Sequence, residues 1–198
     1  MNDKSEPLLR FEAAEQLFTI IKPEAEISNL TAPGMSTINF LNTLAQKKLL
    51  PDAIRYLAIA LPRREAIWWA CATHRTLGSD QLDDINEQDA WRIVEEWVYN
   101  PTEDTRNQTY AIADTLGYQT PGAYGAMAVF WSGGSIAPPE SGQIVPPGPG
   151  LTGTAVGASI LMTCSKGEPK GAAERQKEAL RIGLDVAYGG NGLEQDKK

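Results

Sequence analysis

Apolar residues recur every three or four positions along most of this chain, a spacing that predicts α-helices. The stripes with this spacing cover residues 14–21, 36–48, 51–61, 62–78, 86–100, 102–116 and 173–187. Ser36, Asn86 and Thr102 stand where N-caps are expected, and Pro51 and Pro62 fit first helical turns. Apolar and polar residues do not alternate over any long stretch, so the pattern does not predict a β-sheet.

Two further segments, residues 121–131 and 151–164, are apolar on nearly every side. A helix of this kind is usually the buried centre of a bundle. The sequence therefore predicts an all-α fold, a single-domain bundle of about seven to eight helices over residues 1–198 with this pair at its centre. The polar residues 1–7 and 191–198 are expected to form flexible tails.

The nineteen residues Ser132–Gly150, called the strap below, connect these two apolar segments. They contain five prolines and five glycines, which neither a helix nor a strand accommodates. So long a connection is usually functional or disordered. We expect an ordered strap laid over the bundle, extended at its two Pro-Pro pairs, with Ile144 and Val145 packed against the helices. A recognition surface for a partner is the other interpretation, and both can hold.

Charge and composition narrow the function. The 198 residues carry a formal net charge of −7, which argues against a nucleic-acid-binding protein and against adhesion to an anionic membrane. The N-terminus lacks the layout of a secretory signal, and no apolar run approaches the roughly 20 residues of a membrane span. Cys71 and Cys164 lie on apolar segments and are expected to be reduced core residues, so we expect a cytoplasmic protein.

No motif predicts a catalytic, metal or cofactor site. His74 is the single histidine and Cys71 precedes it by one helical turn, but no acidic partner is evident. The spacing of cysteine and histidine fits no zinc site. An acidic group made up of Asp80, Asp83, Asp84, Glu87 and Asp89 lacks the ligand spacing of a calcium loop and is expected to be a solvated helix start.

The strap and the segment that begins at Leu61 hold the candidates for binding another protein. Arginine and tryptophan are frequent at interface hot spots, and two arginines can donate hydrogen bonds to a strap whose prolines have no N–H. We therefore expect Arg63 and Arg64 to bind strap carbonyls. The glycines after Trp131 are expected to end a helix rather than form a phosphate loop, because no Lys-Ser/Thr pair follows them. The full candidate set is Arg63, Arg64, Trp68, Trp131, Ser132, Ser135, Pro138, Pro139, Pro146 and Pro147.

Two motifs, LPRREAIWWAC at residues 61–71 and WSGGS at residues 131–135, together with the proline pairs that follow, resemble an uncharacterised bacterial all-helical family, a domain of unknown function. The resemblance spans most of the chain. It implies an association with type VI secretion gene neighbourhoods and an accessory, adaptor or chaperone role for a secreted effector. It transfers no catalytic residue.

The resulting hypothesis is a non-enzymatic protein that binds another protein. Two alternatives remain open. One is an immunity protein whose acidic surface masks a toxin. The other is an enzyme or small-molecule-binding domain with a pocket beneath the strap, where Arg63 and Arg64 would hold an anion or carboxylate.

Overall fold

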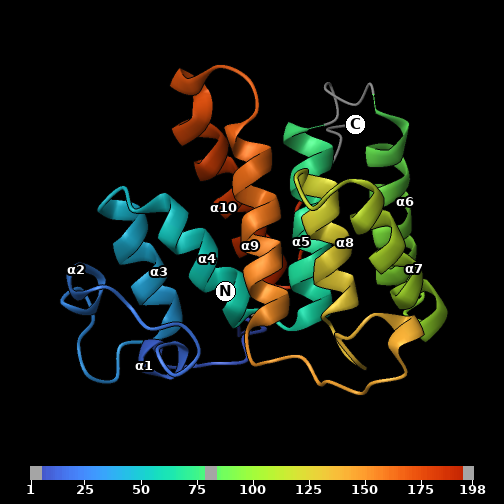
Figure 1. The fold of residues 1–198 in the computed structure, drawn as a ribbon. Helices are drawn as coiled ribbons and strands as arrows, with labels where there is room; N and C mark the ends of the chain where they lie inside the picture. Colours follow the sequence, from blue (N-terminus) through green and yellow to red (C-terminus); the bar gives the residue numbers. More distant parts are fainter. Residues whose placement is uncertain (1–5, 79–83, 194–198) are drawn as a thin grey trace.

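Long helices form where the apolar stripes predict them, except near the N-terminus (Figure 1). The computed structural model describes residues 6–78 and 84–193, and within these ranges there is no β-strand, only an isolated bridge between Ala13 and Ser36. The all-α prediction is confirmed. The helices of ten or more residues are α3 (Thr37–Gln46), α4 (Leu50–Ala60), α5 (Arg63–Leu77), α6 (Ile85–Tyr99), α7 (Glu103–Thr115), α8 (Pro121–Phe130), α9 (Leu151–Ser165) and α10 (Ala172–Ala187).

The N-terminal region folds into shorter pieces than its pattern predicts. The helix expected over residues 14–21 ends after one turn as α1 (Ala14–Leu17), and a second turn, α2 (Ala25–Ser28), lies between the first two apolar stripes. Ala14 and Leu17 are buried, so the apolar stripe still marks the face that joins the core. The prediction was wrong on length: Phe18, Ile20 and Ile21 pack against the core from the turns that follow α1 rather than from a longer helix.

Capping residues set most helix starts as expected. The side chains of Ser36 and Thr102 each accept a hydrogen bond from the N–H three residues on. The prediction for Asn86 is wrong: Asp84 is the N-cap of α6, and its carboxylate accepts a hydrogen bond from the Asn86 N–H at 2.8 Å. The stripe placed the helix correctly, but several polar residues precede it and any of them could have been the cap.

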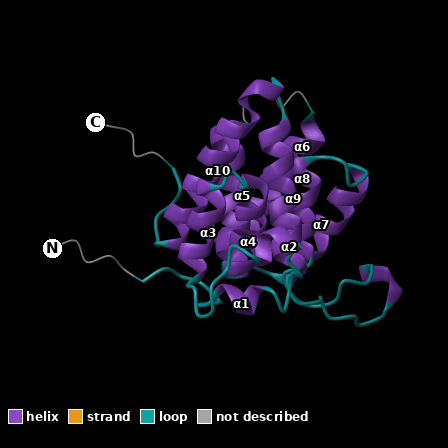
Figure 2. Ribbon diagram, turned by 90° about the vertical axis from the view of Figure 1, so that its left-hand side faces the viewer, coloured by secondary structure: helices purple, strands orange, loops and turns teal. Residues whose placement is uncertain are grey.

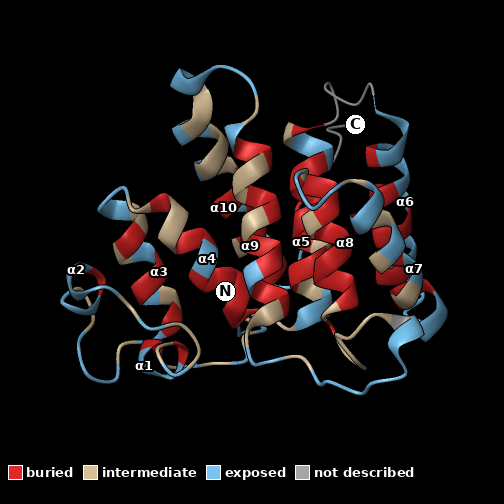
Figure 3. Cartoon of the chain, viewed as in Figure 1, coloured by how far each residue is buried: buried red, intermediate tan, exposed pale blue. Residues whose placement is uncertain are grey.

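Helices α8 and α9 form the centre of the bundle, as their apolar character predicts (Figure 2). Helix α9 packs against α4, α5, α8 and α10, while α6 and α7 cover the other side of α8. The α4–α9 contact depends on Gly153, since a Cβ there would lie 2.5 Å from the backbone oxygen of Ala58. Burial follows this arrangement: α5, α8 and α9 are mostly buried, and exposed residues gather on outer helices and in the strap (Figure 3).

The strap leaves α8 at Trp131 and returns to α9 at Leu151, with one short 3-10 turn, Pro139–Ser141, on the way. It runs along one end of the bundle and extends beyond the helices (Figures 1 and 2). Ile144 is 88% exposed and Val145 40% exposed. The expectation that these two side chains pack down onto the bundle is therefore wrong.

The chain after α10 turns back against the bundle. Gly192 donates its N–H to the Asp185 carboxylate at 2.8 Å, and Asn191 accepts a hydrogen bond from the Trp68 indole at 2.9 Å. The flexible tails predicted for residues 1–7 and 191–198 lie mainly outside the described residues and stay predictions there. Among the helices of the described ranges, none has the length and apolar character needed to cross a membrane.

Candidate functional site

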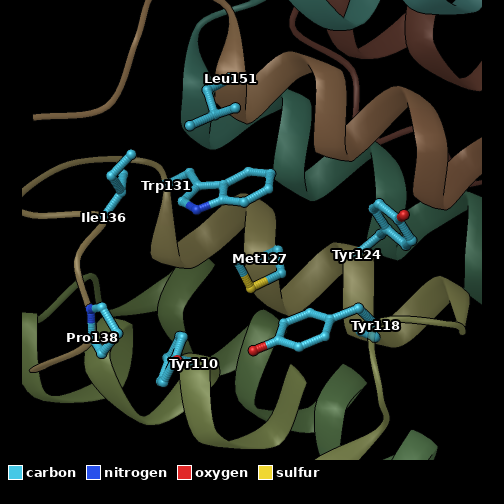
Figure 4. A pocket seen from close by; sticks show the side chains of 9 residues that line it. Tyr110, Tyr118, Tyr124, Met127, Trp131, Ile136, Pro138 and Leu151 are labelled. Atoms are coloured by element: carbon cyan, nitrogen blue, oxygen red, sulfur yellow. The ribbon is translucent and has the colours of Figure 1, made fainter. Parts of the chain in front are cut away.

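An apolar groove of about 560 Å³ lies between α7, α8 and the base of the strap (Figure 4). We call it the aromatic groove. Its lining residues share the absence of charge, and most are aromatic or large and apolar. They are Tyr110, Tyr118, Ala123, Tyr124, Met127, Trp131, Ile136, Pro138 and Leu151. This volume is within the range of sites that bind small molecules or peptide side chains.

Tyr118 is placed at the groove by an unusual backbone turn. Gly117 and Tyr118 follow α7 with φ values of 61° and 57°, in the left-handed region that a residue with a Cβ occupies at a cost of about 1 kcal/mol or more. The turn directs the Tyr118 ring toward the groove (Figure 4), and its hydroxyl donates a hydrogen bond to Asp114 at 3.2 Å. Partial desolvation, and then the hydrogen bond to Asp114, raise the pKa of Tyr118 to about 12, so the phenol is protonated at neutral pH.

Ser135 closes the strap into a loop at its root. Its hydroxyl donates to the Gln143 carbonyl at 3.0 Å and accepts from the Ala137 and Val145 N–H groups at 3.2 and 3.0 Å. The Ile136 N–H adds a backbone hydrogen bond to the Val145 carbonyl at 2.8 Å. These bonds give Ser135 a structural role and make the strap an ordered element, as predicted.

One of the two predicted arginine donors binds the strap. Arg63 donates from Nη1 to the Ser132 carbonyl at 2.8 Å, which confirms that prediction. Arg64 instead donates to the Val98 carbonyl at 2.6 Å, at the end of α6, so its predicted strap contact is wrong. Its position one residue further along the helix turns the side chain toward a different neighbour.

Arg106 on α7 takes the place expected for Arg64. It is 5% exposed and donates to the Phe130 carbonyl at 2.8 Å and to the Ser135 carbonyl at 3.3 Å, with Glu103 as its ion-pair partner at 2.8 Å. A Cβ at Gly134 would lie 2.5 Å from its Nη2, and the φ of 56° at Gly134 also favours glycine. Sequence reasoning missed Arg106, although its spacing of three, four and seven residues from the inward-facing positions 109, 110 and 113 placed it on the buried face.

The predicted candidates fall into two separate places. Arg63, Trp131, Ser132, Ser135, Pro138, Pro146 and Pro147 lie on or at the strap, as does the backbone of Pro139. Trp68 lies with Arg64 in a different, smaller hollow of about 250 Å³, where its ring meets Tyr99 edge-on at 5.8 Å. Neither Arg63 nor Arg64 lines the aromatic groove, so the groove does not contain the two arginines predicted to bind an anion or carboxylate beneath the strap.

Cys71 and His74 do not form an activated pair. Burial raises the pKa of the Cys71 thiol, which opposes a thiolate. Burial and then the positive charge of Lys166 lower the pKa of His74 to about 4, and its ring stacks on Trp91 at 4.3 Å. Both residues are therefore neutral members of the core at pH 7.

The acidic group at the start of α6 is not uniformly solvated. Asp84 caps the helix, but Glu87 is 3% exposed and accepts hydrogen bonds from α8, which corrects the expectation for that residue. Asp80 and Asp83 lie outside the described residues. Within residues 6–78 and 84–193, no group of three acidic, cysteine or histidine side chains is close enough to hold a metal ion.

Comparison with known proteins adds a family but no activity. The curated proteins include no match to this chain, and neither do the solved structures. A family match covers residues 40–187, from within α3 to the end of α10, and so includes the strap, both arginines that bind it and the whole aromatic groove. The chain belongs to the family of unknown function DUF6931.

Proposed function

We propose that this protein is a non-enzymatic binding protein that holds an extended, apolar, proline-containing segment of another protein in the aromatic groove. The observation that supports this proposal is the lining of the groove: three tyrosines, a tryptophan and a methionine, with Pro138 of the strap on one wall. Grooves built from aromatic rings bind proline-rich segments in many proteins, because such segments are already extended and lose little entropy on binding.

The chemistry of the tyrosines suits such a ligand. Proline offers a carbonyl but no N–H, so a groove for proline needs hydrogen-bond donors more than acceptors. The Tyr118 phenol, whose pKa is raised, is protonated at neutral pH and lies at the groove. Its hydroxyl can turn from Asp114 to a ligand carbonyl, and the flat rings of Tyr110 and Tyr124 can pack against proline.

The partner is expected to be uncharged or basic where it meets this protein, since the chain carries a net charge of −7. The family resemblance implies a context of type VI secretion. On that basis we propose that the partner is a secreted effector and that this protein is its cytoplasmic adaptor or chaperone. In cells that secrete the effector, a groove variant would then lower secretion, and a surface variant away from the groove would not.

The groove can be tested without knowing the partner. A displayed library of random nine-residue peptides is selected on the wild-type protein and counter-selected on Leu151→Glu. Leu151 is the first residue of α9 and lines the groove, so glutamate there charges the groove at a helix position that favours an acid. Enriched peptides that combine proline with aliphatic residues and lose binding on Leu151→Glu would support the proposal.

Ile85→Asp is the matched control. Ile85 is 64% exposed at the first position of α6, and this helix begins at the end of the bundle opposite the strap (Figure 1). The variant therefore adds a charge at a helix start without touching the groove. Selected peptides should bind this variant as they bind the wild type. Peptide binding in the groove would be contradicted if the selected peptides bind Leu151→Glu as well as the wild type, or if the selection enriches no peptide.

A small apolar molecule is the second candidate, because the groove volume of about 560 Å³ also fits a ligand of that class. Thermal-shift screening of uncharged aromatic fragments tests it. Stabilisation of the wild type and of Ile85→Asp, but not of Leu151→Glu, together with a failed peptide selection, would favour this candidate.

A further inference from the structure

The strap carries an exposed apolar segment next to the aromatic groove. Ile144, Val145, Pro146 and Pro147 are consecutive, and Ile144 is the most exposed large apolar residue of the described ranges at 88%. Within those ranges, neither the N–H nor the carbonyl of Ile144 takes part in a backbone hydrogen bond. The segment is therefore an exposed, proline-containing apolar peptide of the kind that the groove is proposed to hold.

This segment is fixed in its exposed conformation. The bonds of Ser135 to Gln143 and Val145, and the bond from Ile136 to Val145, hold the residues on both sides of Ile144. A segment that is already ordered loses little conformational entropy when it binds, which favours its use as a ligand. The fixed root also means that Ile144 stays out of the groove of its own chain, as its exposure shows.

The segment and the groove are neighbours on one surface. Ile136 and Pro138 line the groove, and Ile136 is also the residue that pairs with Val145. A surface that carries a projection beside a matching hollow is self-complementary, and a two-fold axis between the two features brings each projection into the hollow of the other copy.

We propose that two copies of this chain pair through their straps, with Ile144 of each copy seated in the aromatic groove of the other. The proposal rests on the proposed function and names the occupant of the groove when no partner is bound. A partner segment would compete for the same groove and separate the copies. Each copy contributes one projecting segment and one groove, so we expect a weak dimer that forms only at about micromolar concentration or above.

Sedimentation velocity over a concentration series is the first test. The wild type and Ile85→Asp are expected to shift from monomer to dimer as concentration rises. Ile144→Asp, which charges the projection, and Leu151→Glu, which charges the groove, are each expected to remain monomeric at the highest concentration. Ile85→Asp repeats the chemical change of Ile144→Asp at another exposed isoleucine. A wild type that stays monomeric would overturn the proposal, and so would dimers that still form in both Ile144→Asp and Leu151→Glu.

Disulfide capture identifies the contact even when it is weak. Cys71 and Cys164 are buried, so a cysteine introduced at the surface is the reactive one. Ile144→Cys mixed with Leu151→Cys should give a cross-linked heterodimer under mild oxidation, at least several times more than Ile85→Cys mixed with Leu151→Cys. Equal yields from the two mixtures would overturn the proposal. So would a double variant, Ile144→Cys with Leu151→Cys, that closes only within one chain.

A free peptide separates failure of this inference from failure of the proposed function. The synthetic peptide SGQIVPPGP, residues 141–149, is titrated calorimetrically into Ile144→Asp, whose groove is unchanged. Binding that Leu151→Glu abolishes, without any cross-linked heterodimer, would leave the groove as a peptide site and reject the second copy as its occupant. Absence of both peptide binding and cross-linking would reject both proposals.

Discussion

The two ends of helix α8 are held by buried charges of opposite sign. At the N-terminal end, the carboxylate of Glu87 from α6 accepts the Gly122 N–H at 2.7 Å and the Thr120 hydroxyl. At the C-terminal end, the guanidinium of Arg106 from α7 donates to the Phe130 carbonyl at 2.8 Å. Each charge complements the helix dipole at its end.

The two ends differ in what lies beyond them. Glu87 is buried, and its carboxylate also accepts a hydrogen bond from the Trp91 indole at 3.2 Å. Arg106 reaches past the helix to the Ser135 carbonyl and shares its charge with Glu103, whose side chain is 68% exposed. The same electrostatic principle therefore stabilises the core at one end and positions the strap and groove at the other.

Loss of the N-terminal anchor is expected to have the largest effect. Glu87→Ala would leave the Gly122 N–H, the Thr120 hydroxyl and the Trp91 indole without their acceptor in a buried site. We expect the free energy of unfolding to fall by about 3–5 kcal/mol, measured by urea denaturation. Glu96→Ala on the same helix is the control, because that side chain is 57% exposed and should change stability by about 0.5 kcal/mol or less. Similar losses in both variants would contradict the anchoring role of Glu87.

Loss of the C-terminal anchor should lower the free energy of unfolding by less, and it should also loosen the strap. Arg106→Ala removes the donors to Phe130 and Ser135, and we expect a loss of roughly 2–3 kcal/mol because two carbonyls lose charged donors. In Arg106→Ala, hydrogen exchange at the Ile136 and Val145 amides should accelerate more than the loss of global stability accounts for. In Glu87→Ala, exchange at the same amides should accelerate only as much as the loss of global stability predicts. Arg92→Ala, with a side chain that is 64% exposed, serves as the control. If hydrogen exchange at the strap amides is unchanged in Arg106→Ala, Arg106 does not hold the strap in place.

Two adjacent glycines, Gly133 and Gly134, test how closely the strap approaches Arg106 at the C-terminal end of α8. Gly134 has a φ of 56° and faces Arg106, while a Cβ at Gly133 would meet nothing within 4 Å. Gly134→Ala is expected to cost about 1–2 kcal/mol, from the left-handed backbone and the displaced guanidinium, and Gly133→Ala to stay within about 0.5 kcal/mol. Thermal denaturation of the two variants in parallel measures the difference. Equal effects would show that neither the backbone at Gly134 nor its contact with Arg106 is constrained.

The sequence predicted the helices better than the contacts between them. Apolar stripes identified α3 to α10 and placed α8 and α9 at the centre, because burial of one helix face leaves a periodic record in the sequence. The two anchors were missed although the spacing of Arg106 placed it on the buried face of its helix. Glu87 and Arg106 are charged residues on buried faces, and composition alone assigns such residues to the surface.

The groove was predictable only in its position. A pocket beneath the strap was one of the alternatives that the sequence left open, and the groove lies at the base of the strap, with walls from residues 110–138 and from Leu151. Its apolar character did not follow, because the expected donors Arg63 and Arg64 suggested an anion site. Their side chains bind backbone carbonyls instead, and which carbonyl an arginine reaches depends on helix packing that a single sequence does not show.

The smallest expected effect tests the surroundings of the N-terminal anchor through pH. Trp91, which donates to Glu87, also stacks on His74, whose pKa in the folded state is lowered to about 4 by burial and the charge of Lys166. The unfolded chain has an ordinary histidine pKa near 6.5, so between about pH 6.5 and pH 4 it binds more protons than the folded chain. The contribution of His74 to stability is therefore full well above pH 6.5, and it is lost as the pH falls through 6.5 toward 4. Between pH 7 and pH 6 we expect the free energy of unfolding, measured by urea denaturation, to fall by about 0.5–1 kcal/mol.

His74→Phe keeps an aromatic ring on Trp91 and removes the titrating group, so the stability of this variant should be nearly constant over that interval. An equal loss in the variant would assign the pH dependence to other groups, because His74 is the single histidine of the chain.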